Sequence, residues 1–184
     1  MRAISAALLR VERVVLIALT LAVTVLILLN VVTRSTGMAL FWVDEAAIYT
    51  MIWAVFVGAS MQVRLRAAIS VDLVPMALGD TAKRVLGFVV DLLVLSFALT
   101  LIWLSFIWYD PIGLAQAGFD FGAFAGSTFN FIYDEPTVTV GIPKFLIWLI
   151  MPILGLTLTV HSIANLADRL TGAAGPVLED LVAS

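Results

Sequence analysis

Hydrophobic residues gather in four long runs, and the segments between these runs carry most of the charged residues. The runs predict helices over residues 14–33, 43–63, 85–109 and 143–167. Each run approaches the ~20 apolar residues with which a helix crosses the hydrocarbon core of a bilayer. The pattern therefore predicts an all-α integral membrane protein with four transmembrane helices. We expect residues 1–184 to form a single membrane domain.

The connections between the predicted helices differ in character. The first, around Gly37, is short enough for a tight turn between antiparallel helices. In residues 67–82, apolar and polar positions alternate, which predicts a short helix lying in the membrane interface between the second and third spans. Residues 110–142 are rich in glycine and phenylalanine, and we expect an extended loop there.

Lysine and arginine residues are divided unevenly among these segments. Eight of the ten lie in the N-terminal segment, the second connection or the C-terminal tail, and only Arg34 and Lys144 lie in the first and third connections. Because basic residues collect on the cytoplasmic side, both ends of the chain are predicted to be cytoplasmic. The outer connections instead carry acidic residues, namely Asp44, Glu45, Asp110, Asp120, Asp134 and Glu135.

Composition excludes several classes of function. Hydrophobic residues make up 62% of the chain and charged residues 12%, which does not suit a soluble domain. The formal charge of −3 and the lack of a long basic run argue against nucleic-acid binding. With no cysteine and one histidine, His161, the chain cannot hold an iron–sulfur cluster, a haem ligated by two of its own histidines or a histidine-rich zinc site. We expect no metal, no cofactor and no catalysis, and we expect membrane lipid as a partner.

Asp91 is the one carboxylate that falls well inside a predicted span. Charged residues in the membrane are costly, and they are usually paired or functional. Since Asp91 follows Arg84 by seven residues, we expect a structural ion pair between the two, with Lys83 or Arg66 as alternative partners. Handling of a proton or ion is the other interpretation, and it would require further carboxylates within the membrane.

Small residues recur in the second predicted helix, where Ala54 and Gly58 lie one turn apart. Small side chains allow two helix backbones to approach closely in the membrane. The close contact could form within this chain or with a partner subunit, and the spacing alone leaves both possibilities open.

Several segments, taken in order, resemble the small membrane subunit of tripartite ATP-independent periplasmic (TRAP) transporters. They are Asn30-Val-Val-Thr-Arg34, Trp42-Val-Asp-Glu45, Trp53-Ala-Val-Phe-Val-Gly58-Ala59-Ser60, Arg64, Ile69-Ser-Val-Asp72 and Val140-Gly-Ile-Pro143-Lys-Phe-Leu-Ile-Trp148 followed by Pro152. The resemblance implies a multi-pass protein of the bacterial inner membrane that is not an enzyme. It implies two partners, a large TRAP permease subunit and a periplasmic substrate-binding protein that delivers an organic acid for ion-coupled uptake. The small subunit would serve as a fixed scaffold for the large one.

The resemblance also suggests roles for particular residues. We expect the interface with the large subunit to include Trp53, Gly58, Ser60, Arg64 and Asp72. The outer corner between the first two helices would be fixed by Arg34, Trp42 and Glu45, with an ion pair between Arg34 and Glu45. In the outer loop, contact with the binding protein is expected at Asp120, Asp134 and Glu135.

A self-sufficient membrane channel or exporter, acting as a homo-oligomer, is the alternative hypothesis. Such a protein needs polar residues along a path through the membrane. Thr20, Thr24 and Asn30 in the first helix are spaced at roughly one-turn intervals and offer only a thin polar stripe. The sparse polarity of the spans favours the subunit hypothesis.

Overall fold

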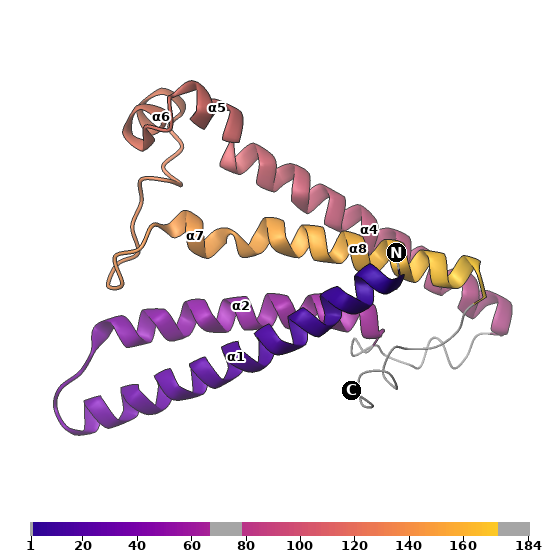
Figure 1. Cartoon of the computed structure of the whole chain (residues 1–184), viewed down its shortest axis with the longest axis horizontal. Helices are drawn as coiled ribbons and strands as arrows, with labels where there is room; N and C mark the ends of the chain where they lie inside the picture. The colour runs from indigo at the N-terminus through magenta and orange to yellow at the C-terminus, as the bar shows by residue number, and fades with distance from the viewer. Residues whose placement is uncertain (1, 67–78, 173–184) are drawn as a thin grey trace.

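The computed structural model describes residues 2–66 and 79–172, and its regular structure there is helical (Figure 1). The long helices are α1 (Arg2–Ser35), α2 (Phe41–Leu65), α4 (Asp80–Tyr109) and α8 (Ile150–Leu170), the last preceded by the short α7 (Lys144–Trp148). Two further short helices, α5 (Pro111–Gln116) and α6 (Phe121–Thr128), follow α4. Within the described residues, four helical segments are long and apolar enough to cross a membrane, which confirms the predicted all-α membrane fold.

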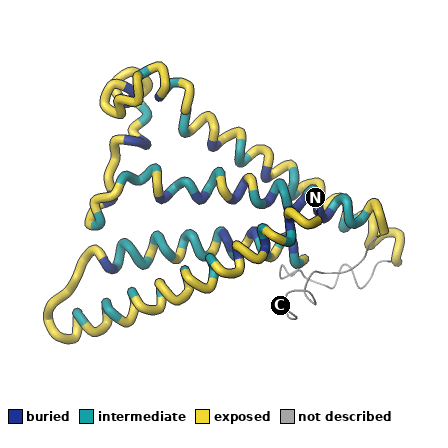
Figure 2. Tube along the Cα trace, viewed as in Figure 1, coloured by how far each residue is buried: buried dark blue, intermediate teal, exposed yellow. Residues whose placement is uncertain are grey.

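The long helices form two antiparallel hairpins. One is α1 with α2, the other is α4 with α8, and the two meet mainly where α2 packs against α8. In Figure 1, α4 and α8 lie together near the N-terminal end of α1 and diverge toward the opposite end, where α5 and α6 lie. The buried residues are concentrated on α8, whereas α1 and α4 are mostly exposed (Figure 2). In the most apolar stretch of α7–α8, 39% of the residues are buried, whereas none is buried in the most apolar stretch of α1. Helix α8 is therefore the central helix of the bundle.

Helix α1 begins at Arg2, twelve residues before the predicted start at residue 14. Its early turns bury Ser5, Leu9 and Glu12, which are spaced so that they share one helix face. The hydropathy pattern missed these turns because their arginines and glutamate interrupt the apolar run. The segment is nevertheless helical, because that face packs against the rest of the bundle.

The last span is divided by Pro152. Helix α7 ends at Trp148, and α8 resumes at Ile150. Proline has no backbone N–H, so Pro152 cannot donate to the carbonyl of Trp148, four residues earlier. The interruption therefore follows directly from the sequence.

The prediction of an extended loop over residues 110–142 was wrong for its first half. Asp110 accepts a hydrogen bond from the backbone of Gly113 at the start of α5, and Asp120 accepts one from Ala123 at the start of α6. Aspartate at a helix N-cap, with proline next to it in the case of α5, is a helix-start signal that the glycine and phenylalanine content obscured. Four buried residues then form a small core beneath the two helices: Leu114, Phe124, Ile132 and Tyr133.

The interfacial helix predicted over residues 67–82 lies mostly outside the described residues, and its last three residues belong to α4. Asp72 also lies outside the described residues. The orientation with both chain ends in the cytoplasm stays a prediction.

Candidate functional site

A buried polar network joins α1, α2 and α8. Glu12 lies at its centre, with one carboxylate oxygen 2.6 Å from Ser60 Oγ and the other 2.9 Å from His161 Nε2. The second ring nitrogen, His161 Nδ1, lies 2.8 Å from Ser5 Oγ, and Ser60 Oγ lies 2.8 Å from Thr157 Oγ1. We call these five residues the buried network.

The buried network brings a serine, a histidine and a glutamate together, as some nucleophilic sites do. Ser5 and His161 are fully enclosed, and Glu12 is only 5% exposed. Buried polar groups are destabilising unless they are hydrogen-bonded, and here the members bond to one another. The arrangement is that of a link between three helices with no access for a substrate. The buried network could not be predicted from the sequence, because Glu12 precedes the predicted span and lies far from His161 along the chain.

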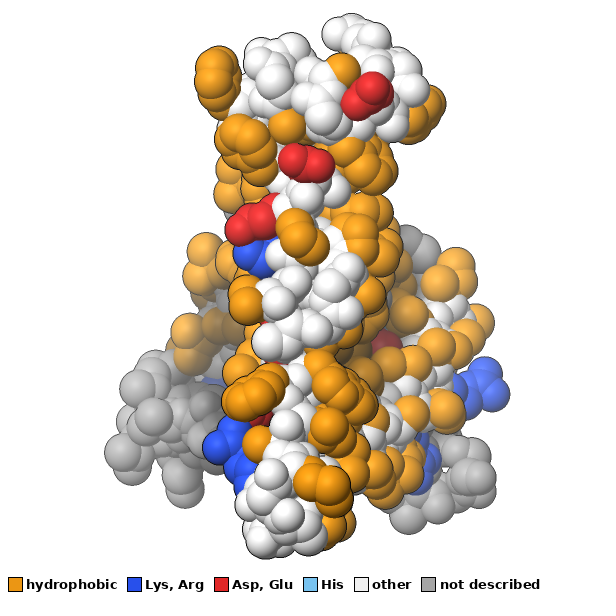
Figure 3. Space-filling view, turned by 90° about the vertical axis from the view of Figure 1, so that its left-hand side faces the viewer, with side chains coloured by type: hydrophobic (Ala, Val, Ile, Leu, Met, Phe, Trp, Pro, Cys, Tyr) orange, Lys and Arg blue, Asp and Glu red, His pale blue; other side chains and the backbone are white. Residues whose placement is uncertain are grey.

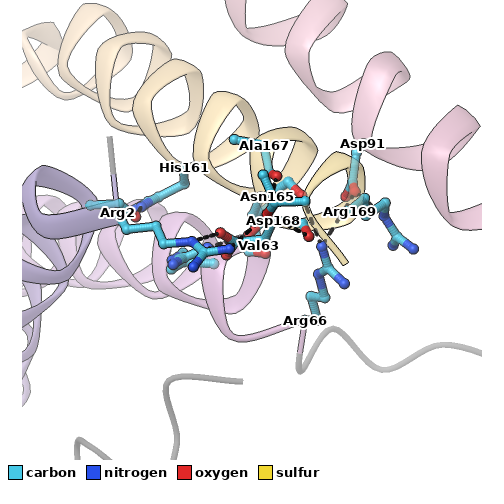
Figure 4. Close-up of polar contacts among 12 residues, drawn as sticks. Arg2, Val63, Arg66, Asp91, His161, Asn165, Ala167, Asp168 and Arg169 are labelled. Carbon is cyan, nitrogen blue, oxygen red and sulfur yellow. Dashed lines mark hydrogen bonds and ion pairs between the residues drawn. The ribbon is translucent and has the colours of Figure 1, made fainter. Parts of the chain in front are cut away.

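A second polar cluster lies at the ends of α2 and α8 (Figure 4). Arg64 Nη1 donates to Asn165 Oδ1 over 2.7 Å and to Asp168 Oδ2 over 2.9 Å, and Arg2 forms an ion pair with Asp168. Asn165 Nδ2 donates to the carbonyl of Val63 over 2.8 Å. The side chain of Arg64 is 4% exposed, so its charge is directed into the bundle.

Asp91 is paired, but with a different arginine from the one expected. Arg169 at the end of α8 donates through Nε to Asp91, and Arg66 Nη2 lies 3.6 Å from the same carboxylate oxygen. Arg66, one of the alternative partners, thus contacts Asp91, and Arg169 takes the place expected for Arg84. Two turns separate Arg84 from Asp91 on one helix, whereas α8 brings Arg169 directly alongside α4. Burial, and then the positive charge of Arg169, lower the pKa of Arg66.

Gly87 on α4 makes room for Arg169. A Cβ atom at Gly87 would lie 2.2 Å from Arg169 Nη1 and 2.4 Å from its Cζ, which is closer than real side chains allow. The guanidinium group therefore lies directly against the α4 backbone, and a side chain at position 87 would displace it.

The predicted ion pair between Arg34 and Glu45 is replaced by one between Arg34 and Asp44. Asn30 also bonds to Asp44, and it accepts a hydrogen bond from Arg34 Nε over 2.8 Å. Neighbouring residues on a helix point about 100° apart, so only one of the two carboxylates can face α1.

Glu45 instead holds the segment that precedes α7. Its carboxylate accepts hydrogen bonds from the backbone of Val138 (2.8 Å), Thr139 (2.6 Å) and Val140 (2.9 Å), and from Thr139 Oγ1 (2.6 Å). We call this the outer clamp, because it ties the start of α2 to the connection between α6 and α7. Nothing in the sequence pointed to this pairing, since 93 residues separate Glu45 from Val138.

Three residues expected at a partner interface have contacts inside the chain. Ser60 and Arg64 are buried, and Trp53 Nε1 donates to the carbonyl of Ile147 over 2.9 Å. Ser60 bonds to Glu12 of α1 and Thr157 of α8, and Arg64 bonds to Asn165 and Asp168 of α8, so both side chains are engaged within the chain and their place at a partner interface stays a prediction. Gly58 lies beside Leu16 of α1, at 3.9 Å from where its Cβ would be, and lines a shallow groove between α1 and α2. Trp42 at the start of α2 is 43% exposed.

The three acidic residues proposed for docking have different surroundings. Asp120 caps α6, and Glu135 accepts a hydrogen bond from Lys144 Nζ over 2.6 Å. Asp134 is exposed. Figure 3 looks onto this end of the molecule, where acidic side chains lie among hydrophobic ones. Nearby, Tyr133 donates to the carbonyl of Tyr109 over 2.6 Å, and burial raises the pKa of the Tyr133 phenol, so the donor proton is retained.

A family model described as "Tripartite ATP-independent periplasmic transporters, DctQ component" matches residues 23–172. The chain belongs to this family. The resemblance drawn from the sequence segments is thereby confirmed, and the protein is a multi-pass membrane component of a TRAP transporter. No curated protein matches the chain. The matched range begins after Glu12. The buried network therefore connects the first turns of α1, which precede the matched range, to α2 and α8, which lie within it.

Proposed function

We propose that the chain is the small permease subunit of a TRAP-type secondary transporter and acts as a non-catalytic scaffold for the large permease subunit. The complex would take up an organic acid that a periplasmic binding protein delivers, and this uptake would be coupled to the movement of an ion. The protein would reside in the bacterial inner membrane with both ends in the cytoplasm. Family membership supports this proposal at the level of the transporter.

The main support for a scaffolding role is that the polar side chains point into the bundle and the apolar side chains point outward. The charged residues of α2 and α8 bond to other residues of the chain, whereas large apolar side chains cover the outside of α1 and α4. Helices expose such surfaces to lipid or to another membrane protein. The spans thus present apolar surface, and the described residues form no continuous polar path through them.

The thin polar stripe of α1 supports the same conclusion. Thr20 donates to the carbonyl of Leu16 over 2.8 Å, and Thr24 donates to that of Thr20 over 2.9 Å. Asn30 is bonded to Asp44 and Arg34. These groups bond to protein atoms, so the stripe gives little support to the channel or exporter alternative.

For contact with the large subunit, we propose the shallow groove between α1 and α2. Its lining includes Gly58, Ala54 and Val55 from α2 and Thr20 and Val23 from α1. The missing side chain at Gly58 leaves space for a helix of the partner to approach closely. Ser60 and Arg64 would contribute indirectly by fixing α2 against α8. Asp72, on the connection after α2, stays a proposed contact.

For contact with the binding protein, we propose the outer end near Asp134, together with Asp120 and Glu135. Asp134 is the most available of the three, because Asp120 caps α6 and Glu135 is bonded to Lys144. An exposed acidic side chain among apolar ones suits a transient contact, in which charge mainly sets the rate of encounter.

Reconstitution tests the scaffolding role directly. Liposomes containing the chain, its large permease subunit and the binding protein should accumulate an organic acid when a sodium gradient is imposed. Liposomes containing the chain alone should show no flux, and those lacking the chain should show strongly reduced uptake. Solute or ion flux through the isolated chain would reject the scaffold and favour the channel hypothesis.

A further inference from the structure

A basic pocket opens where α2 ends, α4 begins and α8 ends. It encloses about 570 Å³, and its lining residues are Arg66, Arg84, Val85, Phe88, Asp168, Arg169, Leu170 and Gly172. The lining thus combines three arginines with three large apolar side chains. Since α4 and α8 are candidate membrane spans, a bilayer that they cross would place this pocket, at their ends, near the level where hydrocarbon gives way to lipid headgroups.

Positive charge exceeds negative charge around the basic pocket. Two carboxylates lie there, and each is already shared by two arginines: Arg66 and Arg169 contact Asp91, while Arg2 and Arg64 contact Asp168. Among the described residues that line the pocket or form an ion pair there, five are arginines and two are aspartates, an excess of three positive charges (5 − 2 = 3). A cavity with this balance favours an anion.

Two of the arginines have donors to spare. Arg84 makes no hydrogen bond or ion pair with any residue that the structure describes, although it lines the pocket. Arg169 uses Nε for Asp91, and Gly87 lets its guanidinium group lie against α4 (Figure 4). Arginine presents several N–H groups in a plane, and it binds the oxygens of a phosphate through two of them at once.

We propose that the basic pocket binds the phosphate of an anionic phospholipid headgroup, held by Arg66, Arg84 and Arg169, with an acyl chain along Val85 and Phe88. A soluble phosphate would use the same arginines but would gain nothing from the apolar part of the lining. Basic pockets between membrane helices are a known mode of anionic lipid recognition. The inference goes beyond the scaffolding role, since it assigns a ligand to this chain.

The test is a lipid titration of the full-length chain, purified with the subunits that accompany it and stripped of lipid in detergent. Binding of short-chain phosphatidylglycerol is measured by native mass spectrometry, with phosphatidylcholine of the same chain length as the zwitterionic comparison. The variant is Arg84→Gln, because this side chain has no bond in the described structure and its loss should leave the fold intact. Lys83→Gln is the matched control, since it removes the same charge from the neighbouring residue, which does not line the pocket.

We expect phosphatidylglycerol to bind at least about fivefold more tightly than phosphatidylcholine, and Arg84→Gln to weaken it by about fivefold. Lys83→Gln should change the affinity by less than about twofold. Equal losses in the two variants would overturn the proposal in favour of general attraction to surface charge. Displacement of phosphatidylglycerol by millimolar inorganic phosphate would overturn the assignment to lipid, and so would equal affinity for the two lipids.

Discussion

The two ends of the helix bundle are held together by different means. At the end of α2 and α8, buried side chains bond to one another, as Arg64 does to Asn165 and Asp168. At the opposite end, the outer clamp joins the half-buried Glu45 to the backbone N–H groups of an exposed segment. Breaking a buried contact leaves a polar group without solvent, whereas an exposed group regains water or lipid headgroups. The comparison indicates that one end fixes the fold and the other positions a surface.

The largest effect should come from Arg64→Ala. The change removes a buried cation and leaves Asn165 and Asp168 with fewer partners, so the free energy of unfolding should fall by about 3 kcal/mol or more. Unfolding in mixed detergent and SDS, followed by circular dichroism, measures this quantity. Arg10→Ala, at an exposed position on α1, is the control. If both variants were equally stable, the cluster around Arg64 would not hold the bundle together.

Glu12→Ala should have the next largest effect. It leaves His161 Nε2 buried without a partner, which costs about 1–3 kcal/mol, whereas Ser60 keeps its bond to Thr157. Glu12→Gln keeps a hydrogen-bonding side chain of similar size and should lose less. The same SDS titration separates the two variants. A Glu12→Ala protein as stable as the parent would show that the buried network contributes nothing to folding.

Glu45→Gln should leave global stability nearly unchanged and loosen one segment. The amides of Val138, Thr139 and Val140 lose a charged acceptor, so their hydrogen exchange with deuterium should become faster. Exchange mass spectrometry detects this, and α8 serves as the internal reference. Glu135→Gln breaks the neighbouring bond to Lys144 only and is the matched control. Unaltered exchange at residues 138–140 would remove Glu45 from the outer clamp.

The smallest effect should come from Arg34→Gln. Its ion pair with Asp44 is largely exposed, and pairs of this kind contribute about 0–1 kcal/mol. We therefore expect an SDS unfolding curve close to that of the parent. A loss as large as that of Arg64→Ala would contradict the contrast between the two ends.

The spans could be predicted from the sequence because apolar length is a local property. The pairings could not, since they depend on which helices become neighbours. Asp91 has Arg84 nearby in sequence, yet α8 supplies Arg169. Arg34 pairs with Asp44 and not with the adjacent Glu45, because neighbouring residues of α2 point in different directions. Short helices such as α5 could be predicted only from their capping residues, which a hydropathy profile does not detect.

The early start of α1 has a practical consequence. A shortened protein that begins at the apolar run would still cross the membrane, yet it would lack Ser5, Leu9 and Glu12. Both ring nitrogens of His161 would then lose their partners at once, in a place that water does not reach. Hydropathy alone would mark these residues as a dispensable leader, whereas they complete the inside of the molecule.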